Sequence, residues 1–312
     1  MVTPLPFDCV VSYHHNVHTC GVARFNRRLA DYLGVPMVRA SDLGPPKFVY
    51  PIVSVKSSEM EVRDHDQFKR DVLRLSRFVL MIHDYRSDSL EIDLMREATK
   101  VIALNAELAS RAREVRPDVI EGFAVASYTD TPISNSPEMT LITFGMAHKI
   151  QSHGYQRIGE LLNSDSRSFV LEISSALHEG TEFDDSFFEV GEEISGCFQG
   201  NVDFLGFLAD QEVVRRLTRA SAMLAFFPHG ARENNTSLIS AMSLGVPVIT
   251  NLDSWSPPWM VHGETVFDVN LLNSFPSNEV LQKVGTLGKG AVRHLSFSGL
   301  LSLLSDNKNY QN

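Results

Sequence analysis

Helix-starting residues follow an apolar run in the second half of the chain. The stretch Pro228–Thr236 (PHGARENNT) separates the apolar run AMLAFF from the apolar helical pattern SLISAMSL. Asn235, Thr236 and Ser237 are residue types that commonly begin helices. The N–H groups at a helix N-terminus attract anions because the helix dipole leaves partial positive charge there. The pattern predicts an anion site, although an ordinary capped helix would share it.

Three further side chains in this loop suit a phosphorylated, hydroxyl-bearing ligand. Arg232 would add a full positive charge, Glu233 can accept hydrogen bonds from sugar hydroxyls, and Asn234 supplies an amide. In a parallel sheet, ligands bind beyond the carboxyl ends of the strands, where loops of this kind lie. We therefore interpret residues 232–237 as candidate ligand-binding residues.

Two other loops place polar side chains just after an expected strand. His148 and Lys149 follow the strand LITFGM, and a lysine there could reach a diphosphate as a point charge. His83 ends the strand FVLMIH. The alternatives are a solvated surface lysine and a histidine satisfied by neighbouring backbone.

The segment His14–Gly21 (HHNVHTCG) connects the first expected strand to the first expected helix. Gly21 would let the backbone approach a ligand closely. Three histidines and Cys20 suggest a metal site, but their spacing matches no zinc pattern and no nearby carboxylate completes the set. We expect no metal, and interpret the segment as polar lining of an acceptor or phosphate site.

The helix after this segment carries three arginines, Arg24, Arg27 and Arg28. They are typical of a solvated helix face. The functional interpretation is contact with anionic lipid headgroups, so peripheral membrane contact through the first domain stays open.

Strands and helices alternate in both halves, which predicts parallel βαβ units. Strands are expected at Phe7–Tyr13, Val35–Val38, Phe48–Val55, Phe78–His83, Val101–Leu104, Thr140–Phe144, Phe169–Ile173, Val202–Leu205, Ala222–Phe227 and Val246–Thr250. Helices are expected at Val22–Leu33, Asp64–Arg77, Leu90–Thr99, Ala106–Val115, Tyr155–Leu162, Asp210–Arg219 and Ser237–Leu244, with Gly34 and Gly245 as stops. The predicted class is α/β, with two Rossmann-like domains facing each other across a cleft.

Polar and proline residues interrupt this alternation near the middle of the chain. We place an N-terminal domain at 1–130, a linker at 131–139, and a second Rossmann-like domain at 140–290. A C-terminal helix and tail take 291–312. Residues between the strand near 170 and Gly200 show no clear element.

Composition excludes several classes of protein. The 312 residues are 43% hydrophobic with a net charge of −10, which argues against a nucleic-acid binder. No apolar run is long enough to span a bilayer, and no signal peptide is recognisable. Three scattered cysteines fit a reducing compartment, so we expect a cytoplasmic location.

The stretch Glu233–Thr250 (ENNTSLISAMSLGVPVIT) resembles the nucleotide-sugar-binding segment of GT-B glycosyltransferases of the GT4 type. VHGETVFDV, LITFGMAHKIQSHG, NVDFLGF, GVARFNRRLADYLGVP and FVLMIHD resemble further segments of the same family. The resemblance implies a retaining, metal-independent, hexosyltransferase-like enzyme. Such an enzyme moves a sugar from a nucleotide-sugar to a glycan, lipid-linked or other acceptor. It also implies that His83 approaches the donor sugar, that Glu233 holds its hydroxyls, and that no cofactor is needed. By the same resemblance, the domain at 1–130 is the acceptor side and the domain at 140–290 binds the nucleotide-sugar. Donor-binding residues would then be Gly21, His148, Lys149, Arg232 and 234–237.

One departure from the family pattern bears on activity. The family has a second glutamate eight residues after the first, which holds the nucleotide ribose, and Ala241 stands there in this chain. Two alternatives therefore remain. One is a non-catalytic pseudo-glycosyltransferase or sugar-binding partner subunit, and the other is a nucleotide-sugar epimerase on the same fold.

Overall fold

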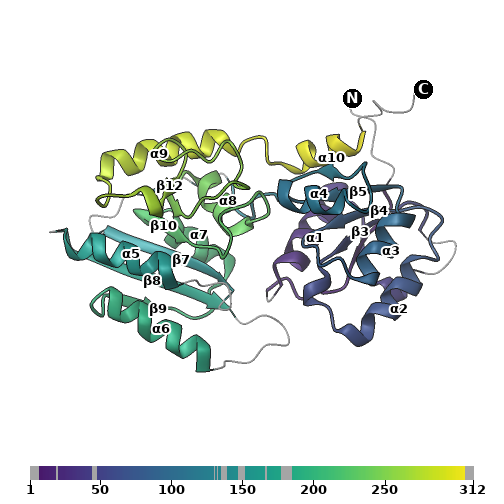
Figure 1. Ribbon diagram of the computed structural model, residues 1–312, viewed down its shortest axis with the longest axis horizontal. Coiled ribbons are helices and arrows are strands. Elements are labelled where there is room, and N and C mark those ends of the chain that lie inside the picture. The colour runs from purple at the N-terminus through teal and green to yellow at the C-terminus, as the bar shows by residue number, and fades with distance from the viewer. Residues whose placement is uncertain are drawn as a thin grey trace. The chain divides into compact units, whose positions relative to one another are not determined.

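The computed structural model describes residues 7–18, 20–43, 48–129, 131, 133–134, 139–146, 152–165, 167–176 and 185–305. The chain divides into two compact units. Unit 1 is Met1–Val125 together with Leu295–Asn312, and unit 2 is Ala126–His294. Each unit has its own parallel sheet and its own apolar core (Figure 1).

The sheet of unit 1 has six strands in the order β2-β1-β3-β4-β5-β6. All its pairings are parallel. The strands are β1 (Val10–Ser12), β2 (Met37–Val38), β3 (Ile52–Val55), β4 (Val79–Ile82), β5 (Lys100–Ala103) and β6 (Ile120–Glu121). The helices are α1 (Gly21–Leu33), α2 (Val62–Val72), α3 (Ser89–Glu97), α4 (Ala106–Ala112) and α10 (Phe297–Ser305), with 3-10 turns η1 (Ala40–Asp42) and η2 (Ser57–Glu59). The strand order reverses between β1 and β3, which is where such sheets bind ligands.

The sheet of unit 2 has the order β12-β11-β10-β7-β8-β9, again with parallel pairings. The strands are β7 (Met139–Met146), β8 (Phe169–Ala176), β9 (Val202–Phe204), β10 (Ala222–Ala225), β11 (Val248–Thr250) and β12 (Phe267–Asp268). The helices are α5 (Ser152–Asn163), α6 (Asp185–Cys197), α7 (Asp210–Leu217), α8 (Thr236–Leu244) and α9 (Asn278–Ala291), with the 3-10 turn η4 (Val269–Leu271). This is the dinucleotide-fold order 3-2-1-4-5-6, and its reversal lies between β7 and β10.

Most expected elements are confirmed, with strands shorter than the apolar runs that predicted them. The run Phe48–Val55, for example, contributes only β3 (Ile52–Val55). Helices α1 and α8 end where glycine was expected to stop them. Gly34 and Gly245 adopt left-handed φ values of 69° and 88°, which cost a glycine little.

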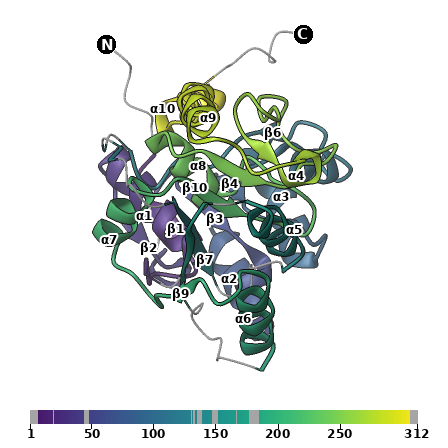
Figure 2. The same ribbon diagram turned by 90° about the vertical axis from the view of Figure 1, so that its left-hand side faces the viewer.

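Helix α6 was not expected from the sequence. It lies in the stretch before Gly200 and contacts α5 (Figure 2). A Cβ on Gly159 of α5 would lie 2.5 Å from the Cys197 carbonyl oxygen, so the absence of a side chain at Gly159 permits this close approach. The two-residue strands β6 and β12 were also missed, because two residues carry no detectable periodicity.

The last described helix packs on unit 1 although it follows unit 2 in the chain. Phe297, Leu300, Leu301 and Leu304 of α10 are buried in one cluster with Leu29 of α1 and with residues of β1, β3, β4 and β5. Lys100 at the start of β5 also donates a hydrogen bond to the Leu304 carbonyl. Figure 1 shows α10, in yellow, near β5. Docking of α10 therefore closes one face of the sheet of unit 1.

Candidate functional site

The strand-order reversal in unit 2 is flanked by the loops that follow β7 and β10. The first loop contains His148 and Lys149, which lie outside the described residues, so their assignment stays a prediction. The second loop, 226–235, is described throughout and leads from β10 into α8. It carries the remaining donor-binding candidates of unit 2.

Hydrogen bonds to backbone groups connect the loop after β10 to Asn251, the residue that follows β11. The Asn251 amide accepts from the Phe227 N–H at 2.8 Å and donates to the Phe227 carbonyl at 2.7 Å. The Ala231 N–H donates to the Asn251 carbonyl at 2.9 Å. These bonds extend the contact between adjacent strands past their ends, so the loop is held on both sides of Pro228.

Arg232 is held by a bidentate ion pair. Its two terminal nitrogens donate to the two carboxylate oxygens of Asp253 at 2.8 Å each. Arg232 is 6% exposed. Burial opposes ionisation of Asp253, but the hydrogen bonds from Arg232 and from the Trp255 N–H keep the pKa of this carboxyl below its ordinary value. Asp253 thus compensates the charge that the sequence suggested for phosphate binding.

Gly230 allows this ion pair to form. Its φ is +85°, and a Cβ there would lie 2.9 Å from Cγ of Asp253 and 3.1 Å from Nη1 of Arg232. Both the left-handed backbone and the close approach therefore favour glycine.

Helix α8 begins at Thr236, one residue before the expected start at Ser237, with Asn235 as its N-cap residue. The Asn235 side chain turns back to accept from the Arg232 N–H at 2.6 Å, and it makes no cap bond to the helix. The Asn235 side chain therefore accepts no hydrogen bond from the first turn of α8, and the Thr236 N–H donates to the Asn234 carbonyl at 3.0 Å. A helix end in this state is suited to an anionic ligand.

Glu233 lies between the ion pair and the helix start. It is 8% exposed, so its carboxylate is largely withdrawn from solvent. Its neighbours in sequence are fixed: Arg232 by Asp253, and Asn235 by the backbone of Arg232. Glu233 and Asn234 therefore lie between residues whose positions are held by hydrogen bonds.

Ala241, at the position of the second family glutamate, has 0% exposure. The preceding residue, Ser240, is also fully buried; its hydroxyl donates to the Thr236 carbonyl and accepts from the Ser127 N–H at 2.7 Å. A longer acidic side chain at 241 would enter the core of unit 2.

His83 and Gly21 belong to unit 1. Nε2 of His83 lies 2.8 Å from Oγ of Ser54 on β3, and its ring packs edge-on against Phe25 at 5.1 Å. Enclosure of the ring, and next the positive charge of Lys56, lower the pKa of His83 to about 3, with Glu59 opposing. His83 is therefore neutral at physiological pH. A Cβ on Gly21 would meet nothing within 4 Å, so packing alone does not require glycine there.

Two of the three α1 arginines make contacts within unit 1. Arg24 donates to the Val17 carbonyl at 3.1 Å, and the Arg28 guanidinium lies 5.8 Å from the centre of the Phe297 ring. Arg27 is exposed. Among the described helices, none is long and apolar enough to cross a bilayer.

Sequence reasoning missed Asn251 and Asp253, which fix the loop. The same rule that singled out residues 228–236 would have found them, because they directly follow β11, the neighbour of β10. It also missed Glu59, which the fold brings against His14 and Cys20.

The solved structures that resemble this chain share one fold. No family model and no curated protein matches the chain. Solved structures do match. The apo form of the lipopolysaccharide outer core galactosyltransferase WaaB has a TM-score of 0.60 at 11% identity, covering 96% of this chain and 99% of that chain. Anabaena Alr3699/HepE in complex with UDP and glucose gives 0.66 at 11%, covering 96% and 98%.

Sucrose-phosphate synthase from Thermosynechococcus elongatus gives a TM-score of 0.69 at 11% identity, covering 95% of this chain and 96% of that chain. These similarities run over nearly the whole of each chain. The two Rossmann-like units therefore define the GT-B fold of glycosyltransferases.

Proposed function

We propose that this protein is a glycosyltransferase that moves a sugar from a nucleotide-sugar donor to a glycan, lipid-linked or other acceptor. The observation that carries the proposal is the fastened loop at the strand-order reversal of unit 2. It presents Glu233 beside the N-terminus of α8. The match to HepE, whose structure was solved with UDP and glucose, supports a nucleotide-sugar donor.

The chemistry proposed for this loop is stabilisation of a leaving nucleoside diphosphate. The positive end of α8, with the N–H group of Ser237, would face the developing charge, and Lys149 and His148 would add to this from the loop after β7. Because Arg232 is paired with Asp253, it would contribute less positive charge to the phosphate site than an unpaired arginine. We assign Arg232 the role of positioning Glu233. Glu233 and Asn234 would bind donor hydroxyls.

We propose a retaining mechanism without a metal, in which the departing phosphate accepts the acceptor's proton. This assignment rests on the family resemblance and requires no protein base. His83 would act as a neutral imidazole that orients the donor sugar, and Gly21 would admit the ligand close to the backbone of α1. A hexosyl donor and a cytoplasmic location complete the proposal.

Thermal unfolding against nucleoside diphosphates and nucleotide-sugars tests the donor site. Ligand at about 100 times its dissociation constant should stabilise the protein by roughly 2.7 kcal/mol. We expect a shift with one nucleotide-sugar that Glu233→Gln reduces and Glu264→Gln, an exposed control in the same unit, retains. A flat response across the panel would refute the proposal.

A non-catalytic relative is the second candidate, and burial of Ala241 favours it. Without an acidic residue there, the ribose contact of the family is missing. Such a protein would bind nucleotide-sugar weakly and release no nucleoside diphosphate. An epimerase would instead convert the donor in the absence of any acceptor. Measuring nucleotide release and donor isomer with and without acceptors separates the three.

Peripheral membrane contact through α1 is proposed on the arginines alone. Since Arg24 and Arg28 already have partners within unit 1, Arg27 is the most accessible of the three. Flotation with phosphatidylglycerol vesicles at low salt tests this, where charge attraction is strongest. Equal recovery with neutral and anionic vesicles would refute it.

A further inference from the structure

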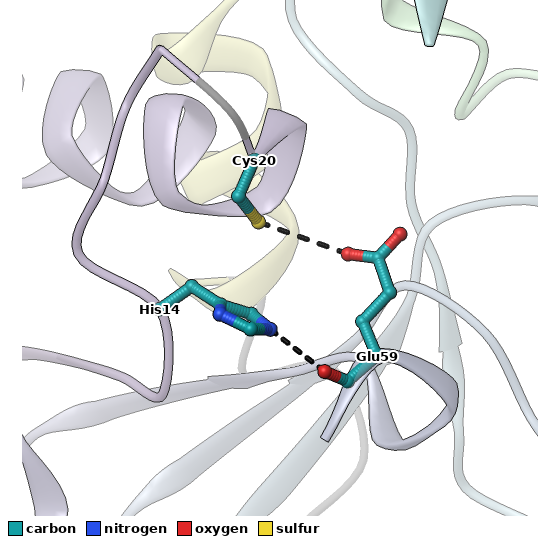
Figure 3. Close-up of side chains that lie close together, drawn as sticks. All are labelled: His14, Cys20 and Glu59. Atoms are coloured by element: carbon teal, nitrogen blue, oxygen red, sulfur yellow. Dashed lines mark hydrogen bonds between the residues drawn. The ribbon is translucent and has the colours of Figure 1, made fainter. Parts of the chain in front are cut away.

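The strand-order reversal of unit 1 brings together three residues of metal-ligand type. His14 and Cys20 come from the segment between β1 and α1, and Glu59 comes from η2, which follows β3. In Figure 3 the Cys20 thiol points at the Glu59 carboxylate, and Nε2 of His14 lies 2.8 Å from the Glu59 backbone carbonyl. One ligand atom from each lies within 4.8 Å of the others. We propose that His14, Cys20 and Glu59 form a binding site for a divalent transition metal, with zinc the best fit.

The donor set has the chemistry that zinc prefers. Imidazole nitrogen, cysteine sulfur and carboxylate oxygen are its usual ligands in proteins. A thiolate and a carboxylate together neutralise a divalent charge. Binding would exchange the thiol proton of Cys20 for the metal, and the proton would pass to solvent. No redox step is involved.

The distances require only a modest contraction. Sγ of Cys20 lies 3.7 Å from Oε2 of Glu59. A sulfur and an oxygen on one tetrahedral zinc are about 3.5 Å apart, given bond lengths of roughly 2.3 and 2.1 Å. The widest separation in the cluster would have to shorten by roughly 1 Å.

Neighbouring groups hold the Glu59 carboxylate and the backbone of His14 in place. Lys56 donates to Oε1 of Glu59, so the other carboxylate oxygen faces Cys20. The Ser12 hydroxyl donates to the His14 carbonyl at 2.6 Å and itself accepts from the buried Asn26 amide at 2.8 Å. Outer groups of this kind orient metal ligands and typically change metal affinity 10–100-fold.

Cys20 occupies a position that is unusual for a cysteine. It is the N-cap of α1, is 1% exposed, and its Sγ accepts from the Ala23 N–H at 3.4 Å. Serine, threonine, asparagine and aspartate are the preferred caps, so capping alone does not account for a cysteine facing a carboxylate.

This site corrects one expectation from the sequence. The histidine-rich segment was judged to lack a carboxylate, and the fold supplies Glu59 from almost forty residues further along the chain. With three protein ligands, the fourth tetrahedral position would be open to water or another ligand. The site lies wholly in unit 1.

Cobalt substitution tests the proposal on the full-length, untagged, chelator-treated protein. We expect one equivalent of Co²⁺ to produce a near-ultraviolet thiolate-to-cobalt absorption band that Zn²⁺ then removes. Cys20→Ser keeps a cap residue at α1 and should abolish the band and weaken Zn²⁺ binding at least ~10-fold in a competition assay with a chromophoric chelator. Cys197→Ser, which changes a thiol in unit 2, should leave both unchanged.

Glu59→Gln gives an independent variant, because glutamine can still accept from Lys56. It should also weaken Zn²⁺ binding at least ~10-fold. Circular dichroism of the metal-free variants checks that each is folded. If Cys20→Ser is unfolded, the Zn²⁺ affinity of Glu59→Gln tests the proposal instead. No band and no competition by the wild-type protein would overturn the proposal, as would unchanged Zn²⁺ affinity in a folded Cys20→Ser or Glu59→Gln variant.

Discussion

Arg232 and Asp253 form two parallel hydrogen bonds of 2.8 Å between a guanidinium and a carboxylate. The two residues follow different strands, β10 and β11, so the pair joins the donor loop to its neighbour. Because Arg232 is buried and Asp253 about one-third exposed, removing one partner leaves a charge poorly solvated.

Asp253→Asn should therefore destabilise the protein. We expect a loss of about 1–2 kcal/mol, less than for a fully buried pair because solvent screens the Asp253 side. Urea unfolding measures it. Glu160→Gln, which breaks an exposed pair with Arg157, serves as the control and should have little effect. Equal effects of the two changes would contradict this assignment.

Gly230→Ala should be costlier than Gly206→Ala. Both glycines have positive φ, 85° and 64°, so both alanines suffer backbone strain of roughly 1–2 kcal/mol. At Gly206 a Cβ meets nothing within 4 Å, whereas at Gly230 it meets Asp253 at 2.9 Å. The difference in unfolding free energy between the two variants measures the cost of the steric contact between the new Cβ and Asp253. No difference would show that the ion pair can shift away from the Cβ at little cost.

His83 should make stability depend on pH. Its folded-state pKa of about 3 lies below the ordinary value of 6.5, so between these values the unfolded chain binds more protons. Stability from this residue is constant above about pH 6.5 and falls as pH drops toward 3, by at most roughly 1.4 kcal/mol per pH unit.

The measurement compares wild type with His83→Gln in urea at several pH values. The wild-type advantage should shrink on acidification, since glutamine does not titrate. Parallel curves would contradict the prediction, and so would an NMR titration of His83 with a midpoint near 6.5.

Ala241→Glu should destabilise the protein without strengthening nucleotide binding. Position 241 is fully buried, so a glutamate there places an unpaired charge in the core and should cost several kcal/mol. Thermal unfolding should show a large drop in melting temperature, whereas Ala241→Ser should show a smaller one. A stable Ala241→Glu variant with new nucleotide affinity would show that the helix admits a family-like ribose contact.

Local patterns in the sequence were sufficient for much of the fold. Apolar runs alternating with helical periodicity predicted two parallel sheets, because that pattern is set within a dozen residues. Gly34 and Gly245 correctly marked the ends of α1 and α8. The loop at 228–236 was found because strand, loop and helix-start residues are consecutive in the chain.

The tertiary structure alone decided which residues meet across the chain. Strand order placed β10 beside β11, which brought Asp253 to Arg232. The arginine expected to bind phosphate therefore forms an ion pair that connects two loops. It placed β1 beside β3, which brought Glu59 to Cys20. It also assigned α10 to unit 1 through apolar burial that only the folded core reveals. Such pairings depend on long-range packing energies, which no local spacing in the sequence encodes.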